Sequence, residues 1–238
     1  MDSRLLGLRA GLCLPALLAL AACDDNKVPT GQLGRGEFAY VCPSGPDSAC
    51  GTSSSQATTQ LPAQVAVGAS FAVTYAPTVD NGTGVVQGVS GYTVLPASPE
   101  MAGGSGDVMI TQRQGFVALL ARANGTENVD DYVNLRITPI ARVTPDPSSV
   151  SLSAGETQTV TLRPLDVQGG DLAGQIGCMW TVTGAAHVAT LQPLGQGGAV
   201  TIQAAGDGTT TLHAVCGPAT ADVTVSVSGF AADGGTHD

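Results

Sequence analysis

Short runs in which apolar and polar residues alternate recur along the chain from about Leu61 onward. SFAVTYA (70–76) places two aromatic residues and a valine on one side, with threonine and small residues on the other, and DYVNLRI (131–137) alternates in the same way. A period of two residues is that of a half-buried β-strand. Turns rich in glycine and proline separate the runs, and Asn124-Gly125 is a typical hairpin turn. The pattern predicts an all-β protein built from short strands.

The runs fall into two groups of the size expected for β-sandwiches. Residues 60–140 contain short strands with turns at regular spacing, which predicts a first sandwich. The motif TPDP (144–147) predicts a boundary, because proline restricts both its own backbone and that of the preceding residue. Residues 141–230 contain about seven strands, and the terminal residues 231–238 are expected to be disordered.

Residues 141–230 resemble the group 2 bacterial immunoglobulin-like domain. The matching segments are SLSAGETQTVTL, a tryptophan in the third strand, VATL, AAGDGTTTLHA and the closing ADVTVSV. The resemblance implies a seven-stranded sandwich that serves as a spacer or adhesive module and carries no catalytic residues. Residues 60–140 resemble a divergent relative, because VAVGASFAVTY parallels LSAGETQTVTL and VALLARANG parallels TLHAVCGPA. We therefore expect two immunoglobulin-like sandwiches in tandem.

The alternation of apolar and polar residues also predicts that one pair of cysteines faces the core. In IGCMWTV, Cys178 and Trp180 share the bulky apolar face that must be buried, and in TLHAVC the same logic turns Cys216 inward. The third and sixth strands of an immunoglobulin arrangement are neighbours, so Cys178 and Cys216 could form a disulfide beside a core Trp180. Two buried free thiols are the alternative.

The N-terminus carries an export signal. Residues 1–22 contain a basic start and an apolar run too short for a comfortable membrane span, and they end in LAAC (20–23). This segment resembles the lipobox of bacterial lipoproteins. The resemblance implies that Cys23 is lipidated, carries palmitate-type acyl chains and anchors the mature protein in a membrane. An ordinary secretory signal with an incidental cysteine is the alternative.

Residues 23–59 are rich in Gly, Ser, Thr, Asp and Pro and show no apolar period, which predicts a flexible tether. Within it, Cys42 and Cys50 enclose a short loop. Exported proteins reach an oxidising compartment, so a disulfide between these two cysteines is expected. The protein is expected in the bacterial cell envelope, facing the periplasm or the cell surface.

The charge balance excludes several partners. The formal net charge is −10, and Lys27 is the only lysine. Nucleic acid is not expected as a partner, because phosphate neutralisation needs clustered Lys and Arg. The same balance argues against electrostatic docking to anionic lipid.

The sequence contains no combination of residues that is typical of a catalytic site. The histidines at 187, 213 and 237 lack spaced acidic partners, so no metal site and no cofactor are predicted. Asp130 and Asp131 should point to opposite faces of a strand, and residues 80–84 lack the ligand count of a calcium loop.

The expected function is therefore that of a lipid-anchored envelope protein without catalytic activity, a binding, adhesion or spacer module. Its partners would be the membrane, through acyl chains on Cys23, and an envelope protein or polysaccharide. The alternative is a carbohydrate-binding or weakly hydrolytic envelope protein, for which Tyr40, Tyr92 and Tyr132 are the available aromatic residues.

Overall fold

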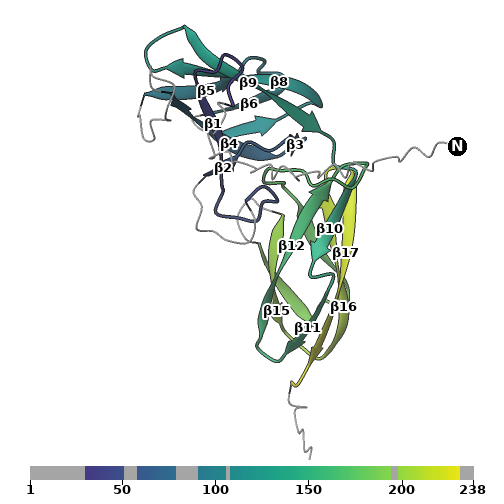
Figure 1. The fold of residues 1–238 in the computed structure, drawn as a ribbon. Coiled ribbons are helices and arrows are strands. Elements are labelled where there is room, and N and C mark those ends of the chain that lie inside the picture. The colour runs from purple at the N-terminus through teal and green to yellow at the C-terminus, as the bar shows by residue number, and fades with distance from the viewer. Residues whose placement is uncertain (1–29, 51–57, 79–90, 106–107, 194–197, 231–238) are drawn as a thin grey trace, which may run out of the picture.

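The computed structural model describes residues 30–50, 58–78, 91–105, 108–193 and 198–230. Every regular element within these ranges is a β-strand, and the strands form four sheets. Figure 1 shows the sheets as two sandwiches in sequence order, the first in purple to teal and the second in green to yellow. The predicted all-β fold of immunoglobulin-like sandwiches is confirmed.

The described residues of the first sandwich form nine strands in two sheets. One sheet has the order β2 (Thr58–Gln60), β1 (Gly36–Val41), β4 (Ser70–Pro77), β7 (Val108–Thr111), β6 (Ala102–Ser105), and the other has the order β3 (Gln64–Ala66), β9 (Val129–Thr138), β8 (Gly115–Ala123), β5 (Tyr92–Pro96). The alternating side chains face inward as the pattern predicts. Phe71 and Val73 of β4 are buried, and so are Leu135 and Ile137 of β9.

In the second sandwich, the part of the chain that the structure describes forms eight strands. One sheet has the order β10 (Arg142–Asp146), β12 (Thr157–Leu165), β15 (Ala199–Ala204), β14 (Ala189–Pro193), and the other has the order β11 (Ser149–Ser153), β17 (Ala219–Ser228), β16 (Gly208–Cys216), β13 (Met179–Gly184). β11 pairs with β17 in parallel, and the remaining neighbours are antiparallel. This is the immunoglobulin arrangement with its first strand divided between the two sheets.

The predicted boundary at residues 144–147 is wrong. These residues lie inside the second sandwich, in the edge strand β10 and the turn through which the chain crosses to β11. Pro145 is tolerated there because an edge strand does not need every backbone N–H for pairing.

The two sandwiches repeat one strand order. The order β1–β4–β7–β6 corresponds to β10–β12–β15–β14, and β3–β9–β8–β5 corresponds to β11–β17–β16–β13. The repeats differ in how their first strand changes sheets. In the second sandwich the crossing takes only residues 147 and 148, whereas in the first the Cys42–Cys50 loop and β2 lie between β1 and β3.

The expectation of a flexible tether is wrong for the described part of that segment, residues 30–50 and 58–59. β1 is the first strand of the first sandwich and pairs along its whole length with β4. Phe38 and Tyr40 on β1 are fully buried. Their alternation in GEFAYV is the signal of a strand, although it lies between stretches rich in glycine, serine and proline.

Candidate functional site: the joint between the two sandwiches

The described residues contain no group of three or more His, Cys, Asp or Glu side chains placed to hold a metal ion. Within the same ranges, no helix is long and apolar enough to cross a membrane. An extended network of hydrogen bonds lies at the contact between the two sandwiches. We call it the joint; it is formed by residues 42–50 and 64–70 of the first sandwich and residues 166–176 of the second.

The backbone of the segment after β12 pairs with the first sandwich. Ala66 donates its N–H to the carbonyl oxygen of Ala173 at 2.9 Å, and Ala173 donates to that of Gln64 at 3.2 Å. Ser70 and Gln175 exchange two further hydrogen bonds of 2.9 Å. These bonds pair residues 173–175 with the β3–β4 region like a short added strand, so their polar backbone groups are satisfied by the other sandwich.

Close packing at the joint requires glycine at position 174. Its φ is +99°, in the left-handed region that glycine adopts without a steric penalty. A Cβ there would lie 2.6 Å from Cβ of Ala69 and 3.0 Å from Cγ1 of Val65. The absence of a side chain therefore lets the two backbones approach closely.

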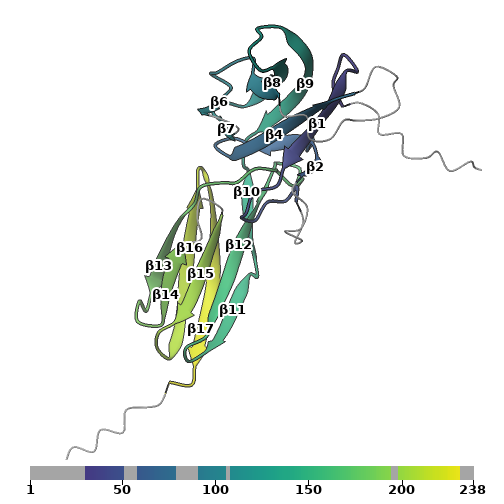
Figure 2. The same cartoon turned by 90° about the vertical axis from the view of Figure 1, so that its left-hand side faces the viewer.

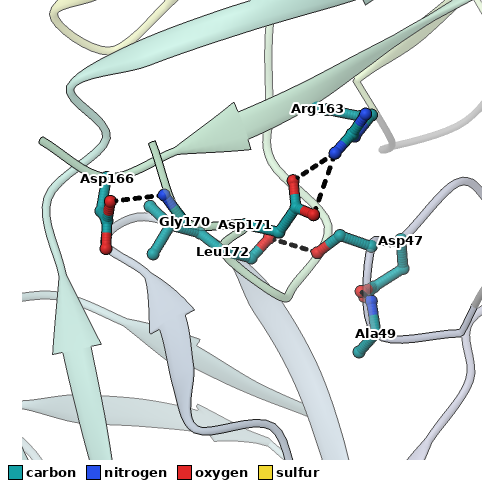
Figure 3. A network of polar contacts seen from close by, with 8 residues as sticks. Asp47, Ala49, Arg163, Asp166, Gly170, Asp171 and Leu172 are labelled. Carbon is teal, nitrogen blue, oxygen red and sulfur yellow. Dashed lines mark hydrogen bonds and ion pairs between the residues drawn. The ribbon is translucent and has the colours of Figure 1, made fainter. Parts of the chain in front are cut away.

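Asp47 in the disulfide-closed loop holds this segment. Its Oδ2 accepts hydrogen bonds from the Tyr40 hydroxyl at 2.5 Å and from the Gly174 N–H at 3.1 Å, and its Oδ1 accepts one from the Ala49 N–H at 2.9 Å. Beside it, the Ser48 hydroxyl donates to the carbonyl oxygen of Leu172 at 2.6 Å. Figure 3 shows how this loop faces the segment that contains Asp171 and Leu172.

Tyr40 is buried and donates a hydrogen bond to Asp47. The expectation that Tyr40 is available to bind a sugar is therefore wrong. Burial raises the pKa of the Tyr40 hydroxyl far above its ordinary value, and the adjacent Asp47 carboxylate raises it further. Tyr40 therefore remains a neutral donor to the carboxylate over the whole physiological range of pH.

A second carboxylate extends the joint. Asp166 accepts hydrogen bonds from the Gln64 side chain at 2.9 Å and from the backbone N–H groups of Gln168 and Gly170. The hydrogen bond from Gln64, followed by that from Gly170, lowers the pKa of Asp166. The contribution of these bonds to stability is thus present at neutral pH and is lost as the pH falls through this lowered pKa.

Apolar packing makes the joint continuous with the protein core. Leu172, Ala173 and Ile176 of the second sandwich are buried in one cluster with Val65 and Ala69 of the first. Interfaces between domains that are hydrophobic and well packed restrict relative motion. The polar and apolar contacts together fix one orientation of the two sandwiches.

Both expected disulfides are present. Cys42 is bonded to Cys50, and Cys178 is bonded to Cys216 with 4.4 Å between their Cα atoms. The second bond joins the neighbouring strands β13 and β16, as the alternation and the strand order predicted. Trp180 follows on the same face of β13, where it is half-buried and packs against both hydrophobic clusters of the protein.

The remaining candidate residues do not come together. His213 lies on the outer face of β16, where its Nδ1 is 2.7 Å from Oδ1 of Asp222, so the expectation that it lacks an acidic partner is wrong. Asp131 is fully buried, and its carboxylate accepts hydrogen bonds of 2.8 Å from the N–H groups of Leu33 and Arg35. Cys23, His237 and residues 80–84 lie outside the described residues.

Removing the Cys42–Cys50 bond is expected to loosen the joint locally. In Cys42→Ala/Cys50→Ala, the loop that carries Asp47 loses its closure, and the chain-entropy model for a separation of 8 residues gives a loss of about 2.5 kcal/mol. Hydrogen exchange should then accelerate at the Gly174 amide, which depends on Asp47. The Leu172 amide, bonded to Pro164 within the second sandwich, is the control and should stay protected. Unchanged exchange at Gly174 would show that the loop holds its position without the disulfide.

The strand order defines the described part of this chain as immunoglobulin-like sandwiches in tandem. No family model and no curated protein matches the chain. Membership of the group 2 bacterial immunoglobulin-like family therefore stays a prediction.

Comparison with solved structures finds matches at low sequence identity and low TM-score. Domains 4 and 5 of the S-layer protein SbsC are 15% identical with a TM-score of 0.34, over 80% of this chain and 97% of that one. The Escherichia coli adhesin FdeC is 20% identical with a TM-score of 0.34, over 71% and 61%. Invasin, a bacterial integrin-binding protein, is 12% identical with a TM-score of 0.32, over 71% and 39%. The chain spans 24% of the structure of SbsC domains 1–6.

Proposed function

We propose that this chain is a lipid-anchored protein of the bacterial cell envelope without catalytic activity, which acts as a binding, adhesion or spacer module. The observation that carries this proposal is the joint. A buried apolar cluster and the hydrogen bonds of Asp47 run continuously from one sandwich into the other. Such a connection makes the pair a rigid element that can hold or present a surface at a set distance from its attachment.

The attachment point would be Cys23 in the lipobox-like LAAC. Seven residue steps separate Cys23 from Thr30, the first described residue, and a fully extended chain of that length spans about 25 Å at most. Buried Asp131 then ties the backbone of Leu33 and Arg35 to the first sandwich. The first sandwich would therefore lie close to the membrane, much closer than a tether through residue 59 would allow.

The second sandwich would extend beyond the first. In Figure 1 the end of β17 lies at the far end of the second sandwich, away from β1 and β9. A rigid joint keeps this end at a defined position relative to the anchor, which is what a spacer or a presented binding surface requires.

Replacing the anchor residue tests the proposal. Cys23→Ala is expected to abolish incorporation of labelled palmitate and to move the protein from the membrane fraction to the soluble fraction, because several acyl chains are needed for stable anchoring. Cys13→Ala, within the predicted signal peptide, is the control and should leave both unchanged. Palmitate-free wild-type protein in the soluble fraction would refute the lipid anchor.

A further inference from the structure

The sheet that contains β5, β8 and β9 carries an unusual set of side chains on its outer face. Alternate residues of these strands, such as Val94, Leu119 and Leu135, are buried in the core, so the residues between them face outward. We define the outer patch as the apolar and basic residues among them: Leu95, Phe116, Leu120, Arg122, Tyr132 and Arg136.

The strand register arranges the outer patch in two rows. Leu95 of β5 lies opposite Leu120 of β8, which in turn lies opposite Tyr132 of β9. Phe116 lies opposite Arg136 toward one end of these strands. Phe116 is 70% exposed and Leu95 is 39% exposed. Large apolar side chains thus face solvent beside basic and aromatic ones in two rows, which are separated by the row of Ala118 and Asn134.

The immunoglobulin-like fold does not itself require apolar, aromatic and basic side chains on this outer face. The equivalent outer face of the second sandwich, on β13, β16 and β17, is covered mainly by hydroxyl side chains, among them Thr181, Thr183, Thr209, Thr211, Thr224 and Ser226. Its exposed apolar residues are the facing pair Met179 and Val215. The first sandwich has therefore acquired apolar, aromatic and basic residues where its repeat has threonine and serine.

Charge distinguishes the outer patch from the rest of the molecule. Arg122 and Arg136 lie on it, and no acidic residue occurs within residues 93–95, 116–122 or 132–136. The whole chain has a formal net charge of −10. The total charge predicted no attraction to anionic lipid, but the charge is unevenly distributed: Arg122 and Arg136 lie on this face, and the acidic residues of β9, Asp130 and Asp131, lie at the start of the strand.

The outer patch also lies next to the point where the chain enters from its anchor. Gln32 donates its N–H to the carbonyl oxygen of Tyr132 at 2.8 Å, so the N-terminal segment runs along the edge of this sheet. In Figures 1 and 2, β8 and the start of β9 lie on the side of the first sandwich away from the second, and β9 runs from there toward β10. The length of chain before Thr30 allows Cys23 to lie within about 25 Å of that residue.

From these observations we propose that the outer patch docks onto the bilayer in which Cys23 is anchored, an inference that rests on the proposed function. Phe116, Leu95 and the ring of Tyr132 enter the interfacial region, where burial of apolar surface and amphipathic rings is favourable. The exposed Arg136 extends to the lipid phosphates. The docked first sandwich orients the rigid pair on the membrane surface.

Vesicle binding by unlipidated protein tests the docking separately from the anchor. The mature chain carrying Cys23→Ala is sedimented with vesicles of phosphatidylethanolamine and phosphatidylglycerol at 3:1 and with neutral phosphatidylcholine vesicles, at low and high salt. The test variant is Phe116→Glu/Leu95→Glu. The control is Met179→Glu/Val215→Glu, whose side chains in the second sandwich are 69% and 38% exposed. Thermal unfolding verifies that both variants fold.

The expected result is salt-sensitive binding to the anionic vesicles that falls at least tenfold in the test variant, since burial of one large apolar side chain is worth about one to two factors of ten. The control should bind like the parent. Equal loss in both variants, or no binding by the parent, would overturn the docking. Self-association that depends on Phe116 without vesicle binding would also overturn it and assign the outer patch to a second copy. Because Cys23 is absent throughout, each result is independent of lipidation.

Discussion

Replacing Cys178 and Cys216 together by alanine is expected to lower the free energy of unfolding of the second sandwich by about 4 kcal/mol. The bond closes a loop with a sequence separation of 38 residues, and the chain-entropy model assigns about that value to a loop of this length. The two substitutions also remove buried sulfur atoms from the core next to Trp180. The lost crosslink and the lost core packing both lower the free energy of unfolding.

Urea unfolding followed by the fluorescence of Trp180 measures this loss, because Trp180 is the only tryptophan and lies two residues from Cys178. The matched control is made in the Cys42→Ala/Cys50→Ala background, where reduction breaks only the Cys178–Cys216 bond and keeps its sulfur atoms, and the alanine pair is introduced into the same background. A difference between reduced and double-alanine protein isolates the packing contribution. A total loss below about 1 kcal/mol would contradict the prediction and indicate that the reduced chain retains structure in its unfolded state.

The Cys178–Cys216 bond was predictable because it follows from local rules. Alternation turned both side chains inward, and the immunoglobulin arrangement made their strands neighbours. The inward faces of β4 and β9 follow from the same period of two residues. These predictions need only the identity of nearby residues and the fold class.

The joint was not predictable because its contacts join distant parts of the chain. Asp47 and Gly174 are separated by 127 residues, and no local pattern marks either as a partner of the other. Asp47 lies in a segment with the composition of a linker, and its burial depends on a second sandwich that packs against it. The alternation of Phe38 and Tyr40 was the one available signal that this segment is part of the fold.

Asp47→Ala is expected to lower the free energy of unfolding by about 3 kcal/mol and to loosen the joint. The substitution leaves the Tyr40 hydroxyl and the Gly174 N–H buried without their acceptor, and each unsatisfied buried group costs about 1–3 kcal/mol. Asp171→Ala is the control in the same region. Asp171 forms an exposed ion pair with Arg163, and such pairs contribute about 0–1 kcal/mol.

A double-mutant cycle separates the two roles of Asp47. Tyr40→Phe removes one donor and keeps the carboxylate bonded to Gly174, so its effect and that of Asp47→Ala should be less than additive when combined. Small-angle scattering then reports the orientation of the sandwiches. If Asp47→Ala broadens the distribution of shapes, the carboxylate fixes the orientation. If stability falls while the scattering is unchanged, the apolar contacts of Leu172 and Ala173 are sufficient to fix it, and Asp47 serves to satisfy the buried Tyr40 and Gly174.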